Sequence, residues 1–219
     1  MANSAFRAAA AACLGAALLV SAGAMSASAS VITFDDVDTA NPEVAVPNGY
    51  AGLNWDNFST IDPNHTQPSP ITVGGFPNSR SSGAYSAFNL DGAPASISSA
   101  TTFNLISGNF TSAYSNAMTL TITGYLGGTQ VGQVVVHNLT TALMAVTLDL
   151  MNVDKVTFSA SAASDIDGRA YPRTFFAVDD LNVAKTPIPG SLLLLLTGCG
   201  ALGALGIARR RATAADAQA

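Results

Sequence analysis

The sequence predicts an all-β domain, a two-sheet antiparallel sandwich of jelly-roll type, between two apolar terminal segments. Short runs of β-branched and aromatic residues recur along residues 30–185, and Gly- or Pro-rich turns separate them, as in all-β proteins. No stretch of this range repeats its apolar residues with the 3.6-residue period of an amphipathic helix. Eight to ten such strands fit a two-layered sandwich.

The first half of the domain is expected to contain four short strands, at residues 31–34, 53–58, 84–90 and 95–98. Apolar and polar residues alternate around Trp55, and Asp91-Gly92 forms a turn between the last two strands. Pro and Gly are frequent in the remaining segments, which are therefore expected to be loops: 38–48, 62–70 and 74–83.

The second half contains the clearest element, a β-hairpin. Apolar residues and Thr alternate over residues 118–126, Gly127-Gly128 supplies a two-residue turn, and residues 129–137 return with four valines. The other expected elements are strands at 141–150, 155–160 and 175–183, a turn at 151–154 and a polar loop at 161–172.

The composition of the domain limits its partners. Residues 30–185 contain thirteen carboxylates and five Lys or Arg, a net charge of −8, compared with −5 for the whole chain of 219 residues. Nucleic acid and anionic membrane surfaces are unsuitable partners, because both are bound through Lys and Arg. Cations and neutral polymers such as polysaccharide remain compatible. The two cysteines, Cys13 and Cys199, lie outside the domain, so no disulfide is expected in it.

The N-terminal segment has the pattern of a secretory signal peptide over residues 1–29. Arg7 precedes an apolar stretch at 8–20, and Ala27-Ser28-Ala29 offers small residues for cleavage before Ser30. The domain at 30–185 is therefore expected to be exported across the inner membrane.

The C-terminal segment is organised around residues 190–208, which carry no charge. As a helix they would span about 28 Å, close to the thickness of a bilayer core. Arg209, Arg210 and Arg211 follow directly and would remain on the cytoplasmic side, together with a tail at 212–219.

Pro187-Ile188-Pro189, the apolar helix and the arginine cluster together resemble the PEP-CTERM sorting signal, here at residues 186–211. Ile188 stands where that family usually has Glu. The resemblance implies an exosortase as processing partner, in a Gram-negative bacterium that makes extracellular polysaccharide. An ordinary C-terminal membrane anchor is the alternative.

Parts of the domain are also similar to other PEP-CTERM proteins and to the terminal strands of galactose-binding-like jelly rolls. These parts are Val31 to Asp36, Tyr50 to Phe58 and Phe176 to Leu181. The resemblance implies that the first and last strands pair and that their acidic residues hold a structural Ca²⁺. Carboxylate oxygens are ligands that Ca²⁺ prefers. The predicted metal ligands are Asp35, Asp36, Asp179 and Asp180, and the alternative is that they face solvent at strand ends.

Asp165 and Asp167 have the opening spacing of a calcium loop, followed by Gly168. The later ligands of such a loop are missing, so a polar loop is expected.

Three aromatic residues are candidates for stacking on sugar rings: Tyr50, Trp55 and Tyr85. Trp55 lies in an alternating strand, where a core position is the alternative. The function predicted is that of a non-catalytic protein of the cell envelope, cell surface or extracellular matrix, either structural or polysaccharide-binding. A secreted glycan hydrolase is the alternative, although Glu43 is the only Glu and no Gly-x-Ser-x-Gly motif occurs.

Overall fold

The computed structural model describes residues 29–37, 41, 43–65, 71–168 and 173–185. One compact unit, Ala27–Thr186, contains every described strand. Within the described ranges no helix has the length and apolar character needed to cross a membrane. The predicted signal peptide up to residue 28, the transmembrane helix at 190–208 and the whole predicted sorting signal lie outside these ranges.

The described chain consists of ten β-strands and three short 3-10 helices, which confirms the all-β prediction. The helices are η1 (Tyr50–Gly52), η2 (Phe76–Asn78) and η3 (Leu90–Gly92). The strands are β1 (Ala29–Ile32), β2 (Glu43–Ala45), β3 (Asn54–Asp56), β4 (Phe58–Ile61), β5 (Ser86–Asn89), β6 (Ala95–Ser112), β7 (Met118–Leu126), β8 (Thr129–Leu139), β9 (Met144–Ala162) and β10 (Phe176–Lys185).

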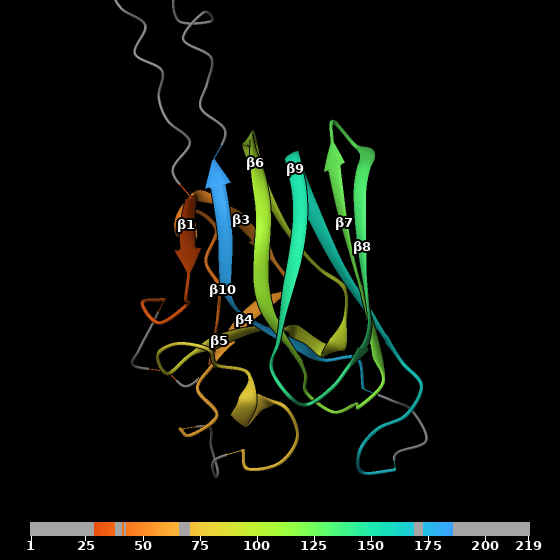
Figure 1. Cartoon of the computed structure of the whole chain (residues 1–219). Coiled ribbons are helices and arrows are strands. Elements are labelled where there is room, and N and C mark those ends of the chain that lie inside the picture. The colour runs from red at the N-terminus through yellow and green to blue at the C-terminus, as the bar shows by residue number, and fades with distance from the viewer. Residues whose placement is uncertain (1–28, 38–40, 42, 66–70, 169–172, 186–219) are drawn as a thin grey trace, which may run out of the picture. The chain divides into compact units, whose positions relative to one another are not determined.

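All ten strands belong to one antiparallel sheet in the order β2-β4-β5-β10-β6-β9-β7-β8, with β1 beside β10 and β3 beside β6. The expected pair of separate sheets is therefore replaced by one continuous sheet. The long strands β6 and β9 explain this, because they pair with each other along both halves, with register shifts between Ser98 and Ser107 of β6. Figure 1 shows both strands bending over at one end of the fold, so that each belongs to two layers.

One hydrophobic core lies between the layers. Both halves of β6 and β9 contribute to it, for example Ile97 and Phe110 of β6 and Leu148 and Phe158 of β9. The burial alternates along β7, where Met118, Leu120 and Ile122 point inward, as the sequence predicts for the hairpin. The hairpin and its Gly127-Gly128 turn are confirmed by the pairing of β7 with β8.

Three differences from the predicted elements have a common cause in the backbone. The expected strand at 53–58 is divided into β3 and β4, because Asn57 adopts a φ of 59°. The expected turn at 151–154 lies within β9, where Asp149 and Asn152 have positive φ and bend the strand without reversing it. β6 continues 14 residues beyond the predicted end at Ser98, to Ser112, through extra residues between Ser98 and Phe103 that shift its register with β9. Inserted or left-handed residues of this kind interrupt the two-residue period without ending the strand.

The first and last strands pair antiparallel, as predicted. Ala29 lies opposite Ala184 and Ile32 lies opposite Leu181. This pairing places the chain just after β1 close to the middle of β10, which is the region where the acidic residues of the sequence prediction occur.

Candidate functional site

The first candidate region, the acidic corner, comprises Asp35, Asp36, Asp179 and Asp180. The segment 81–85 connects its two halves through hydrogen bonds. The main-chain N–H groups of Ala84 and Tyr85 donate to Asp35 Oδ1 at 2.7 and 3.0 Å. Asp179 and Asp180 accept from the other end of the same segment, so the corner holds this loop against β1 and β10.

Asp179 is fully buried in β10 and is hydrogen-bonded on both oxygens. Its Oδ2 accepts from the N–H and the hydroxyl of Ser81 and from the N–H of Ser82, at 2.7 to 3.0 Å. Its Oδ1 accepts from the N–H of Asp180. Burial raises the pKa of Asp179, and the main-chain donors oppose that rise.

Asp36 and Asp180 complete the corner through side-chain contacts. The hydroxyl of Tyr50 donates to Asp36 Oδ1 at 2.7 Å, and the hydroxyl of Ser82 donates to Asp180 Oδ1 at 2.8 Å. Burial and, next, the hydrogen bond to Asp36 raise the pKa of the Tyr50 hydroxyl. Tyr50 therefore stays a neutral donor at physiological pH.

The four residues predicted as calcium ligands act as hydrogen-bond acceptors in this arrangement. Oδ1 of Asp35 and Oδ2 of Asp179 point at N–H donors, whereas a Ca²⁺ ligand needs its lone pairs directed at the ion. Among the described residues no group of three or more His, Cys, Asp or Glu side chains could hold a metal ion. The structural calcium remains a prediction from the sequence, without support from the geometry of this corner.

The three aromatic candidates do not form an exposed platform. Trp55 is 5% exposed and Tyr85 is 8% exposed, and both belong to the hydrophobic core. The Trp55 ring packs edge-on against Phe34 and Phe58, with ring centroids 5.4 Å away in each case. Burial of both rings corrects the prediction that Trp55 and Tyr85 present faces to a sugar. Tyr50 is half-buried and borders a surface hollow of about 440 Å³.

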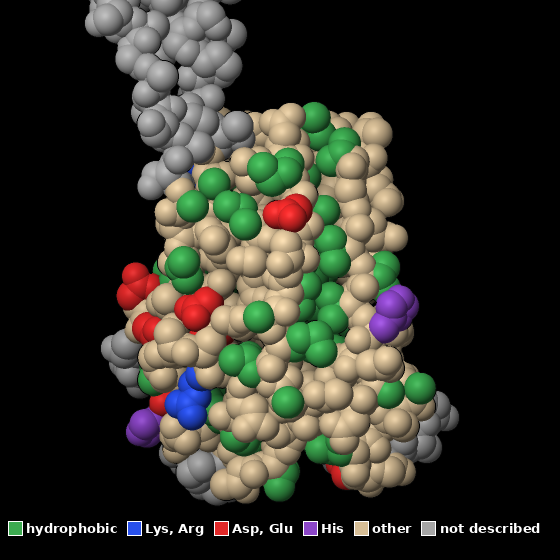
Figure 2. All heavy atoms as spheres, viewed as in Figure 1, with side chains coloured by type: hydrophobic (Ala, Val, Ile, Leu, Met, Phe, Trp, Pro, Cys, Tyr) green, Lys and Arg blue, Asp and Glu red, His purple; other side chains and the backbone are tan. Residues whose placement is uncertain are grey.

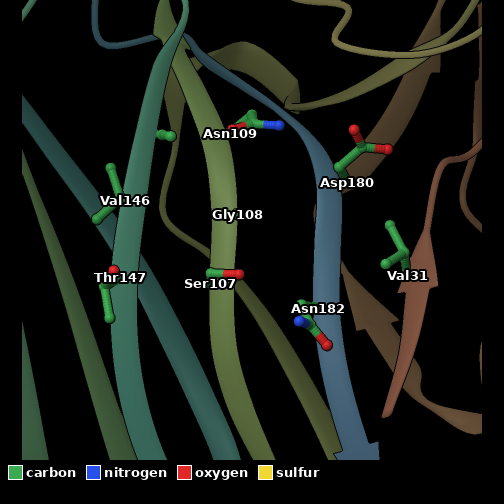
Figure 3. A pocket seen from close by; sticks show the side chains of 9 residues that line it. Val31, Ser107, Gly108, Asn109, Val146, Thr147, Asp180 and Asn182 are labelled. Carbon is green, nitrogen blue, oxygen red and sulfur yellow. The ribbon is translucent and has the colours of Figure 1, made fainter.

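The second candidate region is a hollow of about 340 Å³ on the outer face of the sheet, which we call the polar trough. It crosses β1, β10, β6 and β9, and Figure 3 shows side chains of all four strands around it. Its lining comprises Val31, Ser107, Gly108, Asn109, Ala145, Val146, Thr147, Asp180 and Asn182. Asp180 belongs to both regions.

Strand pairing places the lining of the trough in rows. Val31 lies opposite Asn182, Asn182 opposite Ser107, and Ser107 opposite Thr147. Adjacent strands are about 4.8 Å apart, so this row spans roughly 14 Å across four strands. Asp180 adopts a φ of 50° at an irregularity in β10, where the register with β6 shifts between Asp179 and Asn182. Sequence periodicity does not reveal such a shift, and the trough residues outside the acidic corner were not predicted.

One atom of the trough lacks a partner. Oδ1 of Asn182 is covered from solvent and has no hydrogen-bond partner among the described residues. A covered acceptor without a donor is costly in free energy. Ser107, Thr147 and Asn109 add further hydrogen-bonding groups around it. The trough is therefore suited to a neutral, hydroxyl-rich molecule.

Away from both regions, Arg173 forms a clamp on the loop after β9. Its Nε and Nη2 donate to the two oxygens of Asp165 at 2.6 and 2.9 Å, and Nη2 also donates to Asp167. The guanidinium carbon lies 3.5 Å from the centroid of the Tyr114 ring. The hydrogen bonds from Arg173 lower the pKa of Asp165 to about 2. The polar loop that the sequence predicts here is thus held by an ion pair.

The clamp predicts a specific loss of stability in acid. The pKa of Asp165 is lower in the folded chain than the usual value of about 3.9. Its contribution to the free energy of unfolding is therefore complete above about pH 5 and is lost as pH falls towards 2. Asp165→Asn should lower the free energy of unfolding at pH 7 by about 2 kcal/mol. Urea unfolding at pH 7 and pH 3 measures the difference. Asp167→Asn, at the more exposed carboxylate, should lower the free energy of unfolding by a smaller amount. If Asp165→Asn had the same effect at both pH values, the proposed role of the Arg173–Asp165 ion pair would be contradicted.

Comparison with known proteins supports the fold. No protein-family model and no curated protein matches the sequence. Among solved structures, a DUF4465 family protein from Bacteroides caccae ATCC 43185 superposes with a TM-score of 0.52 at 14% identity, over 73% of this chain and 100% of that chain. At such identity the likeness concerns the fold alone.

Two further solved structures are more distant. A DUF4465 family protein from Bacteroides ovatus ATCC 8483 has a TM-score of 0.42 at 13% identity, over 73% of this chain and 94% of that one. TmCBM61, solved in complex with β-1,4-galactotriose, has a TM-score of 0.32 at 11% identity, over 64% of this chain and 95% of that one.

Proposed function

We propose that the domain is an exported, non-catalytic module that binds a neutral polysaccharide in the polar trough. The observation that carries the proposal is the group of amide and hydroxyl side chains that line the trough on one face of the sheet: Asn109, Asn182, Ser107 and Thr147. Sugar hydroxyls both donate to and accept from side chains of these types. The net charge of −8 on residues 30–185 favours a neutral chain over a polyanion.

The delivery of the module follows from the terminal segments. We propose that the signal peptide directs export and that the PEP-CTERM-like segment at 186–211 is processed by an exosortase at the inner membrane. The domain then reaches the cell surface or an extracellular matrix, where a polysaccharide ligand is available. Removal of the arginines Arg209 to Arg211 is expected to abolish the processing while leaving the domain folded.

A hydrolytic role is less well supported. Most glycosidases use two carboxyl groups on either side of the scissile bond. Asp180 is the one carboxylate in the lining of the trough, and its Oδ1 already accepts from Ser82. We therefore propose that the domain binds the polysaccharide and does not hydrolyse it.

Affinity gel electrophoresis of the purified protein in gels containing galactan, xylan, mannan or dextran tests this function. At least one neutral polymer should retard the protein, and Asn182→Ala or Asn109→Ala should weaken the retardation at least tenfold, the loss expected for one or two hydrogen bonds. Thr101→Ala, at an exposed position of β6 outside the trough, should have no effect.

Two outcomes would contradict the proposal. One is retardation by an anionic polymer such as alginate that the trough variants leave unchanged. The other is release of reducing sugar from the polymer by the wild-type protein and not by Asp180→Asn, which would indicate a hydrolase.

A further inference from the structure

The edges of the sheet differ greatly in length and charge. Four described strands pair with a single neighbour: β1, β2, β3 and β8. Three of these strands have only three or four residues, and β2 begins with the charged Glu43. β8 has eleven residues, so its free edge is about 36 Å long. Among the described strands, β8 is thus the long open edge.

β8 has no charged residue and no Pro to protect such an edge from pairing. Natural proteins use Lys, Pro, bulges or short strands for this purpose. The two bulges of β8 lie towards its ends, where the register with β7 shifts between Gln130 and Gly132 and between Val136 and Leu139, and the stretch from Gly132 to Val136 is regular. The sequence of β8, TQVGQVVVHNL, contains no Lys, Arg, Asp, Glu or Pro. Val131 is 51% exposed and Val135 is 40% exposed, and both lie on this strand. An edge with these properties offers main-chain hydrogen bonds and apolar side chains to another strand.

The charge distribution indicates which partner is suitable. Each copy of the domain carries a net charge of −8, so two copies repel unless they meet where charge is absent. The whole hairpin from Met118 to Leu139 contains no Lys, Arg, Asp or Glu. In Figure 2 the acidic side chains gather mainly on the side of β1, and none lies over β7 and β8. The edge formed by β8 is therefore a place where two copies can approach closely.

The strand is compatible with its own antiparallel copy. Val134 is the middle residue of β8 and of its regular stretch from Gly132 to Val136, and a two-fold axis beside it aligns this stretch with its own copy. This register places Gln133 opposite Val135 of the second copy and Val135 opposite its Gln133. Each pair shares one face of the sheet, because the residue numbers have the same parity. The resulting interface is closed and isologous.

We propose that β8 is a homodimerisation edge, at which two copies join their sheets into one continuous antiparallel sheet. The trough lies over β1, β10, β6 and β9 and does not include β8. Dimerisation therefore leaves both troughs free, and two linked sites bind a repeating polymer with higher avidity than one. The dimer itself does not depend on the proposed saccharide binding.

Hydrogen–deuterium exchange of the full chain, purified in a mild detergent, tests the edge directly. Amides of β8 that point away from β7 should exchange at least tenfold more slowly at high protein concentration than at low concentration. Val131→Lys/Val135→Lys should abolish this dependence, since it places charge on an exposed edge. Gln133→Lys is a second, single variant with the same expected result. Met151→Lys, on the 55% exposed Met151 of β9, carries the matched charge change and should behave as wild type.

Sedimentation velocity on the same samples gives the assembly state. A dimer that the β8 variants convert to monomer, with an unchanged unfolding midpoint, supports the proposal. Exchange of β8 that is independent of concentration overturns it. Concentration-dependent protection that persists in both Lys variants, or assemblies that grow beyond a dimer, would also overturn it, because the contact would then involve another surface or would not close.

Discussion

Replacement of Phe158 by Ala should destabilise the protein more than any other single change considered for this fold. Phe158 is fully buried, and its ring centroid lies 5.5 Å from that of Phe58, 6.0 Å from that of Phe176 and 6.4 Å from that of Phe110. These rings come from β4, β10 and β6, so Phe158 of β9 connects four strands at the centre of the core. The expected loss is about 4 kcal/mol, the sum of lost burial and the cavity left behind.

Chemical denaturation measures this loss as a shift of the unfolding midpoint at constant slope. Met151→Ala, at an exposed position of the same strand, is the control and should change stability by less than about 0.5 kcal/mol. Phe158→Leu should fall between the two, because it retains most of the buried apolar surface. A Phe158→Ala loss no larger than that of the control would mean that the two layers do not share this core.

Gly83→Ala should cause the second largest loss, about 3 kcal/mol, by opening the acidic corner. Gly83 has a φ of 53°, and a Cβ at this position would overlap the carboxylate oxygens of Asp35. Left-handed backbone alone costs a non-Gly residue about 1–2 kcal/mol. The displaced carboxylate would also leave the N–H groups of Ala84 and Tyr85 without their acceptor, which adds a hydrogen-bond penalty.

The hairpin turn supplies a matched control for this prediction. Gly127 has a similar φ of 56°, and nothing lies within 4 Å of the position that its Cβ would occupy. Gly127→Ala should therefore lower the free energy of unfolding by about 1 kcal/mol, the cost of the left-handed backbone alone. In an Asp35→Ala background the collision is absent, so Gly83→Ala should then cost about as much as Gly127→Ala. Equal costs in the wild-type background would refute the contact between Gly83 and Asp35.

The acidic corner also shows a use of clustered carboxylates other than metal binding. Four Asp residues near paired terminal strands are the same pattern whether they hold a cation or a loop. What distinguishes the cases is the direction of the lone pairs, and here Asp179 points at the N–H groups of Ser81 and Ser82, about 100 residues earlier in the chain. A contact across that distance has no local sequence pattern.

The sequence by itself determined those parts of the fold that depend on local periodicity. The hairpin around Gly127-Gly128 follows from the alternation of Thr with Leu and Ile, and the pairing of the terminal strands was predicted from resemblance and is present. The acidic balance of residues 30–185 and the apolar segments at both ends are also properties of the sequence alone.

The tertiary structure decided where the two-residue alternation of side chains is interrupted and which residues these interruptions bring together. Asn57, Asp149, Asn152 and Asp180 adopt positive φ, which splits one expected strand, removes one expected turn and shifts β10 against β6. Because side chains alternate between faces, one inserted residue moves those beyond it to the other face. Trp55 and Phe58 are thereby both buried, and Asp180 and Asn182 meet Ser107 and Asn109 in the trough. Packing across the whole sheet selects these backbone conformations, which is why the residues next to each break do not identify the site.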